Sequence, residues 1–277
     1  MMDLTYAIDL SSYQRHVPDE TWQAIRRDHG SLAIVQLYGG NPDTGWGPNH
    51  YAYSQLWGAV RADMLIAGYV LPRWDLPLEP DSDGVAQGLE AAGDAAPSLL
   101  FVAIDVEPVR QGWRRDYDIT YAHTLLATAI ERVRSAGHYP IIYTNRWAWG
   151  AVFGHPNSTS AYRDLDLWYA QWDGVDSIEG ISPSPPWPSD RLVGKQYSSN
   201  SLAGTSFDLN VFRSDWVQAR AIEAYVRAHP PQPTPAPPSP PVGPAPVGPD
   251  LAAEVARLRE RLEAVEARLA RLREALS

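Results

Sequence analysis

The sequence Leu99-Leu100-Phe101-Val102-Ala103-Ile104-Asp105-Val106-Glu107-Pro108 is an apolar run that ends in two carboxylates and a proline. A short apolar run between breakers, here Pro97 and Pro108, is typical of a strand buried on both faces of a sheet. Alternate side chains of a strand point the same way, so Asp105 and Glu107 share one face. Crowding and poor hydration raise the pKa of one such carboxyl group, which suits it to donate a proton. The pair alone is equally compatible with a solvated strand end or half of a cation site.

The composition limits the classes of partner. The 277 residues include 23 basic and 33 acidic side chains, and the net charge of −10 argues against nucleic acid or an anionic membrane surface. No run of eighteen apolar residues exists, so no membrane-spanning segment is expected. The chain has no cysteine, which excludes disulfides and thiolate chemistry, and its seven histidines lack metal-ligand spacing. We expect no metal and no cofactor.

Three zones differ in composition. Residues 1–229 are mixed and have the apolar content of a globular domain. Residues 230–249 contain eleven prolines and no charged residue, which predicts an extended linker. Residues 250–277 are rich in Leu, Ala, Arg and Glu at helical spacing, and their six acidic and six basic residues cancel. The net negative charge therefore belongs to the globular zone.

The globular zone predicts an α/β fold. Apolar stretches with strand character cover residues 6–10, 32–38, 68–71, 99–106, 140–144, 165–170, 192–197 and 207–211, and helices are expected at 19–28, 48–67, 81–92, 120–136 and 215–228. Alternating strands and helices predict a parallel sheet, and eight strands predict closure into a (β/α) barrel. Because the second half has fewer helices, the barrel should be irregular. Active sites of such barrels lie where the strands end, and Asp9, Asp105 and Glu107 all fall at strand ends.

Six motifs occur in the order found in the glycoside hydrolase family 25 lysozymes, the Chalaropsis-type muramidases. The stretches that carry this resemblance are Ala7–Gln14 (AIDLSSYQ), Val102–Pro108 (VAIDVEP), Pro140–Thr144 (PIIYT), Leu167–Ala170 (LWYA), Gly194–Ser199 (GKQYSS) and Phe207–Phe212 (FDLNVF). The resemblance spans residues 5–213. It implies an irregular barrel with eight strands and fewer helices, and cleavage of peptidoglycan between N-acetylmuramic acid and N-acetylglucosamine.

The resemblance also assigns residues to the site. The family's acid maps onto Glu107, its neighbouring carboxylate onto Asp105, its first-strand Asp onto Asp9 and its late Asp onto Asp208. We expect Glu107 to protonate the leaving oxygen while Asp105 stays ionised and stabilises positive charge at the anomeric carbon. The sequence leaves open whether the reaction is retaining, inverting or assisted by the sugar's acetamido group. Asp208 alone is also compatible with a simple Asx turn.

Aromatic residues on or just after strands are candidate sugar contacts, although each is equally suited to filling the core. These candidates are Tyr69, Trp74, Tyr143, Trp168 and Tyr197. The chain departs from the family pattern at Gln36–Gly40 and at Tyr69–Trp74, two regions that line the sugar groove in relatives. These departures leave the acids in place and leave the exact substrate open.

The last zone carries a heptad repeat. Its apolar seam is Leu251, Val255, Leu258, Leu262, Val265, Leu269, Leu272 and Leu276, spaced alternately by four and three residues. So narrow a stripe predicts a coiled coil, with Val255, Leu262, Leu269 and Leu276 at a positions. Arg261–Glu266 resembles a motif common in short parallel trimers, so we expect a homo-oligomer and prefer a trimer to a dimer. A helix folded back on its own barrel is the alternative.

The expected function is that of a phage or bacterial lysin acting on the cell wall. Residues 1–5 lack the basic and apolar segments of a signal peptide, so we expect the protein to stay in the host cytoplasm until released. Two other functions fit the same barrel. One is a non-catalytic carbohydrate-binding or virion structural module, and the other is a glycosidase on a different acetamido polymer such as chitin.

Overall fold

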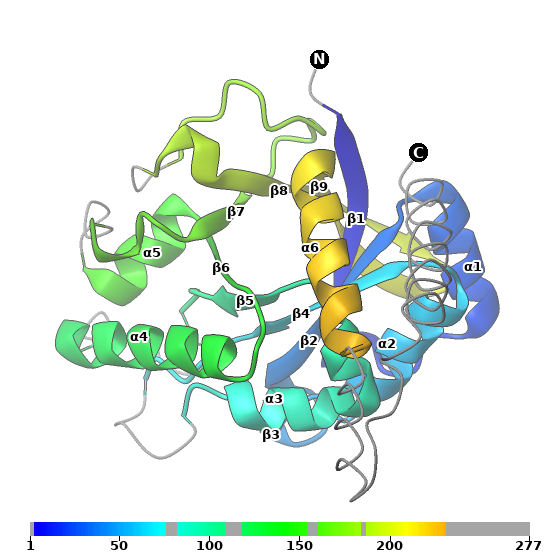
Figure 1. Ribbon diagram of the computed structural model, residues 1–277, viewed down its shortest axis with the longest axis horizontal. Helices are drawn as coiled ribbons and strands as arrows, with labels where there is room; N and C mark the ends of the chain where they lie inside the picture. The colour runs from blue at the N-terminus through cyan, green and yellow to red at the C-terminus, as the bar shows by residue number, and fades with distance from the viewer. Residues whose placement is uncertain (1–2, 76–81, 109–117, 155–159, 184–186, 231–277) are drawn as a thin grey trace, which may run out of the picture.

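The computed structural model describes residues 3–75, 82–108, 118–154, 160–183 and 187–230. The described residues form nine strands, which are β1 (Leu4–Leu10), β2 (Leu32–Asn41), β3 (Gly45–Pro48), β4 (Leu65–Val70), β5 (Val102–Asp105), β6 (Pro140–Thr144), β7 (Asp166–Ala170), β8 (Leu192–Leu202) and β9 (Thr205–Arg213). Eight of them close into a barrel, because β1 pairs with β2 on one side and with β9 on the other (Figure 1). The expected eight-stranded irregular barrel is confirmed.

The barrel is parallel except for its last strand. Seven strands, β1, β2 and β4 to β8, run parallel to their neighbours. β9 is antiparallel to both β8 and β1, since it follows β8 through a tight turn and not through a crossover helix. The first half of β9 therefore lies at the end of the barrel where the other strands finish.

Side-chain alternation divides the apolar residues into two clusters. On β1, Ala7 belongs to the cluster inside the barrel, whereas Ile8 and Leu10 belong to the cluster between barrel and helices. The same alternation on β5 directs Ala103 inward and Ile104 outward. The continuous apolar runs of the sequence thus reflect burial on both faces.

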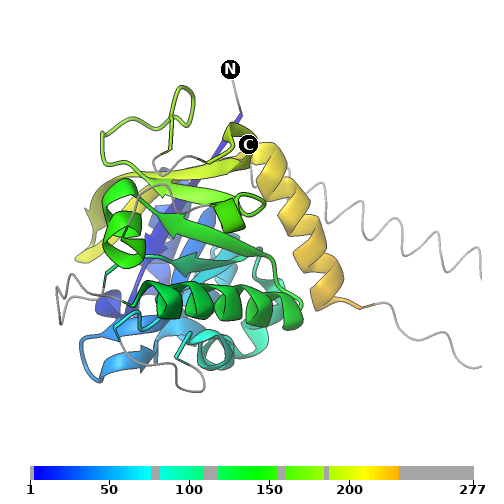
Figure 2. The same ribbon diagram turned by 90° about the vertical axis from the view of Figure 1, so that its left-hand side faces the viewer.

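The helices cover the outside and one end of the barrel. They are α1 (Asp19–Asp28), α2 (Ala52–Arg61), α3 (Val85–Ala92), α4 (Ile119–Ser135), α5 (Arg146–Phe153) and α6 (Ser214–Ala228), with short 3₁₀ turns η1 (Ser12–Gln14), η2 (Gly93–Ser98), η3 (Ser160–Tyr162) and η4 (Ser189–Arg191). α6 stands at one end, and the β2–β3 and β8–β9 hairpins project at the other (Figure 2).

α6 closes the end of the barrel where the strands begin. Its Trp216 packs on Phe101 and Phe212, with ring centroids 5.4 and 6.0 Å apart, and its inner face joins the interior cluster. Arg227 donates hydrogen bonds to the carbonyls of Pro97, Gly137 and Leu99, which precede strands. Only the opposite end of the barrel is left for a site built on strand ends.

Two expected elements differ from the structure. The helix expected at 48–67 is wrong at both ends, because Pro48 lies in β3 and residues 65–67 begin β4. Residues 45–48 pair with the end of β2 although they read as a Gly- and Pro-rich loop. α5 was not expected, and it begins where the Asn145 side chain accepts a hydrogen bond from the Ala148 amide. The linker expected at 230–249 and the coiled coil at 250–277 lie outside the described residues, apart from residue 230.

Close packing inside the barrel predicts the effect of adding one methyl group. A Cβ on Gly194 of β8 would lie 2.5 Å from Cδ1 of the buried Phe212 ring, so Gly194→Ala should lower the free energy of unfolding by about 1–3 kcal/mol. A Cβ on Gly150 in α5 would meet nothing within 4 Å, so the matched control Gly150→Ala should raise it by about 0.5–1 kcal/mol. Denaturant unfolding measures both, and an unchanged Gly194→Ala variant would contradict this packing.

Candidate active site

Four carboxyl groups meet at the open end of the barrel. Asp9 is the last residue but one of β1 and lies directly opposite Asp208 of β9, because the antiparallel register pairs these two residues. Asp105 ends β5 on the inward side of that strand, and Glu107 follows two residues later. The charge of Asp9 acts on each of the other three groups, which places the acids expected from the sequence in one cluster. Asp208 belongs to a strand, so the Asx-turn alternative does not apply.

Burial and mutual repulsion keep protons on the outer members of this cluster. Burial raises the pKa of Glu107 to about 7, and the charge of Asp9 adds to the shift. Burial likewise raises the pKa of Asp208 to about 7, with the charges of Asp9 and Glu107 adding to it. A carboxyl group with a pKa near neutrality carries a proton in a large fraction of molecules and still releases it readily.

Among the four carboxyl groups, Asp9 is the one whose ionised form is stabilised by hydrogen bonds. Burial raises its pKa to about 6, but two hydrogen bonds to the carboxylate oppose this shift. Asn210 Nδ2 donates to Asp9 Oδ2 at 2.7 Å, and Gln196 Nε2 donates to the same oxygen at 3.0 Å. Of these groups, Asp9 therefore has the carboxylate that hydrogen bonds stabilise, whereas the pKa of Glu107 is raised to about 7.

The surroundings of Asp105 oppose the ionised state that the sequence led us to expect for it. Asp105 is only 5% exposed, and among the described residues its Oδ1 has no hydrogen-bond partner. Burial raises its pKa well above the ordinary value, and the charges of Glu107 and Asp9 raise it further. Burial and these two charges thus oppose ionisation of Asp105, whereas the charge that adds to the burial of Glu107 is that of Asp9.

Tyr69 and Tyr143 lie among the four acids. Burial raises the pKa of each phenol well above its usual range, and the charges of the four carboxyl groups raise it further. The Tyr143 hydroxyl donates to Gln196 Oε1 at 2.9 Å, and Tyr69 is half-buried on β4. The structure therefore places two of the five expected aromatic contacts beside the acids.

Of the other three aromatic residues, Trp74 and Trp168 are buried and Tyr197 is partly buried. Trp168 is 2% exposed within the barrel, and its indole N–H donates to Asn210 Oδ1 at 2.9 Å. Trp74 is 1% exposed and packs edge-on against Phe153 outside the barrel, so it has no free face for a sugar. Tyr197 packs against the same outer cluster. Spacing along a strand does not distinguish core positions from the rim, and of the two roles open to these rings the structure favours core filling for Trp74 and Trp168.

Sequence reasoning missed the polar residues that support the acids. Gln196 and Asn210 stand opposite each other on β8 and β9 and contact Asp9. Alternation gave a usable signal, because Asn210 is two residues from Asp208 and shares its face. Trp172 follows β7, is 57% exposed, and donates its indole N–H to Gln196 Oε1 at 2.7 Å. Nothing in its local sequence marks it out from the other tryptophans.

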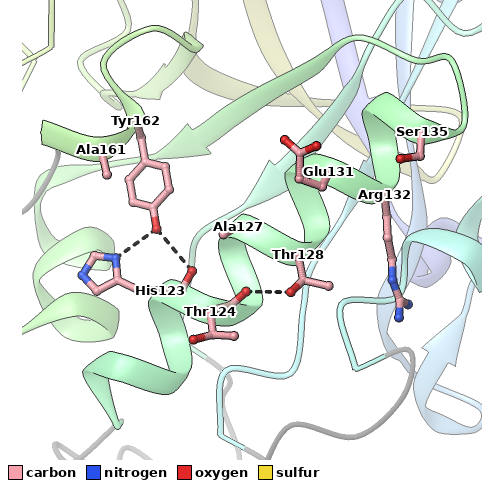
Figure 3. Close-up of a pocket in the computed structure, with 9 residues that line it drawn as sticks. All are labelled: His123, Thr124, Ala127, Thr128, Glu131, Arg132, Ser135, Ala161 and Tyr162. Atoms are coloured by element: carbon pink, nitrogen blue, oxygen red, sulfur yellow. Dashed lines mark hydrogen bonds between the residues drawn. The ribbon is translucent and has the colours of Figure 1, made fainter.

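Other kinds of site find little support in the described residues. No group of His, Asp or Glu there is arranged to hold a metal ion, and no helix there has the length and apolar character to cross a membrane. An open groove runs along α4 beside Tyr162 (Figure 3). Its polar groups bond within the protein, since His123 Nδ1 lies 3.0 Å from the Tyr162 hydroxyl and Arg132 pairs with Asp83. None of the four carboxyl groups lines this groove.

Comparison with known proteins gives matches to lysozymes. The family model described as "Lysozyme-like protein 1" matches residues 2–183. "Probable GH family 25 lysozyme 5" of Dictyostelium discoideum is 28% identical over 119 residues, which are 42% of this chain and 52% of that protein. The chain thus spans about half the length of this curated relative.

Solved structures share the fold. The muramidase from Trichobolus zukalii matches with a TM-score of 0.57 and 18% identity, covering 80% of this chain and 99% of the other. The family GH25 lysozyme from Aspergillus fumigatus gives the same TM-score and identity, covering 79% of this chain and 99% of the other. At these identities the likeness concerns the fold.

Because the carboxyl groups of the site are buried and close together, we expect the free energy of unfolding to fall as they ionise. The pKa of Glu107 is raised from 4.5 to about 7, so the folded state binds more protons than the unfolded state between these values. Its contribution to stability is present below pH 4.5 and lost as the pH rises through 7. Glu107→Gln removes this loss and should raise the free energy of unfolding at pH 8 by on the order of 2 kcal/mol, with no gain at pH 4.

Glu131→Gln is the matched control. Glu131 is exposed on α4 and pairs with Arg134 at 2.8 Å, so its replacement should change the free energy of unfolding by less than about 0.5 kcal/mol at either pH. Denaturant titrations at pH 4 and pH 8 test both variants. A Glu107→Gln variant that is no more stable than the parent at pH 8 would show that ionisation of Glu107 does not destabilise the folded protein.

Proposed function

This chain belongs to the glycoside hydrolase family 25 lysozymes, and from that membership we propose that it is a peptidoglycan muramidase. The proposed reaction is hydrolysis of the β-1,4 bond between N-acetylmuramic acid and N-acetylglucosamine. The observation that carries the proposal is the pairing of a proton-holding Glu107 with an amide-supported Asp9 at the open end of the barrel. Most glycoside hydrolases use one carboxylic acid and one carboxylate that flank the scissile bond.

The two groups have different parts in the proposed reaction. Glu107 donates its proton to the glycosidic oxygen as the bond from that oxygen to the anomeric carbon breaks. The Asp9 carboxylate stabilises the positive charge that develops on the sugar. Water adds to the anomeric carbon, and its released proton restores the acid. Burial and the charges of Glu107 and Asp9 raise the pKa of Asp105, which disfavours the charged role first expected of it.

A non-catalytic role for the barrel has less support. A module that only binds sugar gains nothing from carboxyl groups whose burial opposes their ionisation, because each raises the energy of the folded state at neutral pH. A glycosidase on chitin uses the same acids and differs only in the sugar that it accepts. The released product therefore has to be identified.

Replacement of the proposed acid gives the direct test of catalysis. Glu107→Gln keeps the size of the side chain but cannot release a proton, so hydrolysis of purified cell walls should fall by about 10²–10⁴-fold. Glu131→Gln should hydrolyse walls at the parent rate, because Glu131 lies on the outside of α4. A turbidity assay on isolated walls measures both. Near-parent turnover by Glu107→Gln would remove Glu107 from the mechanism.

The sugar at the new reducing end of each fragment identifies the bond that is cut. We expect borohydride reduction and mass analysis of the fragments to show reduced N-acetylmuramic acid. Reduced N-acetylglucosamine would contradict the muramidase proposal while leaving a glycosidase. Efficient cleavage of chitin without cleavage of walls would favour the second substrate.

We also propose that residues 250–277 join copies of the enzyme, with three chains preferred to two, as in a lysin displayed on a polymeric wall. The support is the unbroken heptad seam, and several linked sites bind a polymer with greater avidity.

Sedimentation equilibrium at micromolar concentration should give three times the 30.7 kDa mass of one chain. Leu262→Asp, in the seam, should give the monomer mass, whereas Ala267→Asp, at an outer f position, should not. A monomeric parent chain rejects the proposal.

A further inference from the structure

Gln196 connects the protein surface to Asp9. It is 4% exposed, and its Oε1 accepts hydrogen bonds from the Tyr143 hydroxyl at 2.9 Å and the Trp172 indole at 2.7 Å. An indole N–H can only donate, so the atom facing Trp172 must be the amide oxygen. The amide nitrogen is thereby turned to Asp9 Oδ2 at 3.0 Å and to Asp208 Oδ2 at 3.5 Å.

A second tryptophan–amide pair reaches the same carboxylate. Trp168 donates to Asn210 Oδ1 at 2.9 Å, and Asn210 Nδ2 donates to Asp9 Oδ2 at 2.7 Å. Two indoles thus orient two amides, and both amides donate to one oxygen of Asp9. The pairs differ in exposure, since Trp168 is 2% exposed and Trp172 is 57% exposed.

The loop that carries Trp172 is fixed to β8. Buried Lys195, next to Gln196, donates to Asp173 Oδ1 at 2.7 Å and to the Val175 carbonyl at 2.8 Å. The hydrogen bond from Lys195 lowers the pKa of Asp173 to about 2, so this ion pair persists over the working pH range. The Gln171 amide also bonds the Gln196 carbonyl at 2.9 Å. Trp172 is therefore an exposed ring in a set position.

We propose that Trp172 is a sugar-stacking residue and that Gln196 is a positioning residue through which a bound sugar steadies the Asp9 carboxylate. The pyranose ring lies on the exposed indole face, fixes the indole N–H, and so fixes the Gln196 amide against Asp9. This inference rests on the proposed glycosidase function. It adds a substrate contact and a link from that contact to the charge of the site.

The titratable groups around Asp9 are those of the site itself. They are Asp208 on β9, Asp105 and Glu107 on and after β5, Tyr69 on β4 and Tyr143 on β6. Neither tyrosine ionises near neutrality, because burial raises both phenol pKa values well above the ordinary 10.0. On the proposed mechanism we expect the acid limb of the pH–activity profile to follow ionisation of Asp9, whose pKa is raised to about 6, and the alkaline limb to follow loss of the Glu107 proton, whose pKa is raised to about 7.

Three variants separate stacking from positioning. Trp172→Phe keeps a ring but loses the indole N–H, so the acid limb should move about one pH unit higher while KM changes less than twofold. Gln196→Met loses the amide and should give the same shift with an unchanged KM. Trp172→Ala should give the shift and raise KM about tenfold. Tyr53→Ala, which removes a 49% exposed ring on α2, should change neither.

The readouts are kcat and KM against pH on solubilised wall glycan. Binding of β-1,4-linked N-acetylglucosamine tetramer to Glu107→Gln protein, measured by calorimetry with and without Trp172→Ala, reports stacking independently of turnover. A parent-like acid limb in Gln196→Met and Trp172→Phe overturns the positioning role, and equal tetramer affinity with and without Trp172 overturns the stacking role. If the parent protein cleaves no wall glycan, the proposed function fails, whereas unshifted variants of an active parent refute only this inference.

Discussion

The energetic cost of removing four carboxyl groups from water governs this structure. Asp9, Asp105, Glu107 and Asp208 crowd one end of a closed barrel. Burial raises all four pKa values, and the charges of neighbouring carboxyl groups raise those of the last three further. No basic side chain of the described residues is among the groups that shift these values. Since repulsion has no counter-charge to relieve it, protons are retained. The reactivity proposed for the site is the consequence of this uncompensated burial.

The barrel makes this arrangement unavoidable. Parallel strands deliver their last inward residues to a common rim, and α6 closes the opposite end with Trp216 packed on Phe101 and Phe212. The antiparallel β9 brings Asp208 to that rim from its first half and sets it opposite Asp9. The site therefore combines residues from the parallel strands with a residue from the antiparallel strand β9. The two amides that support Asp9 also come from the last two strands.

Much of this organisation can be predicted from the sequence, because strands buried on both faces appear as apolar runs and several of these runs end in carboxylates. The strands, the closure into a barrel and the acids Asp9, Asp105 and Glu107 were predicted on that basis, whereas Asp208 was assigned from the family resemblance. β3 was missed because residues 45–48 have the composition of a loop and are held by pairing with β2. The raised pKa of Asp105 was also missed, since it depends on burial and on the charges of Glu107 and of Asp9, which is distant in sequence. The packing of Trp74 against Phe153 is likewise a tertiary contact that spacing does not encode.

The central claim is that Glu107 holds its proton near neutral pH because Asp9 and burial oppose its ionisation. Carbon-13 NMR of protein labelled at the glutamate carboxyl carbons, with Glu107→Gln protein to identify the resonance, follows this group directly. The account predicts a midpoint near pH 7 for Glu107. A midpoint near the ordinary 4.5 would contradict the account, because Glu107 would then have no proton to give at neutral pH.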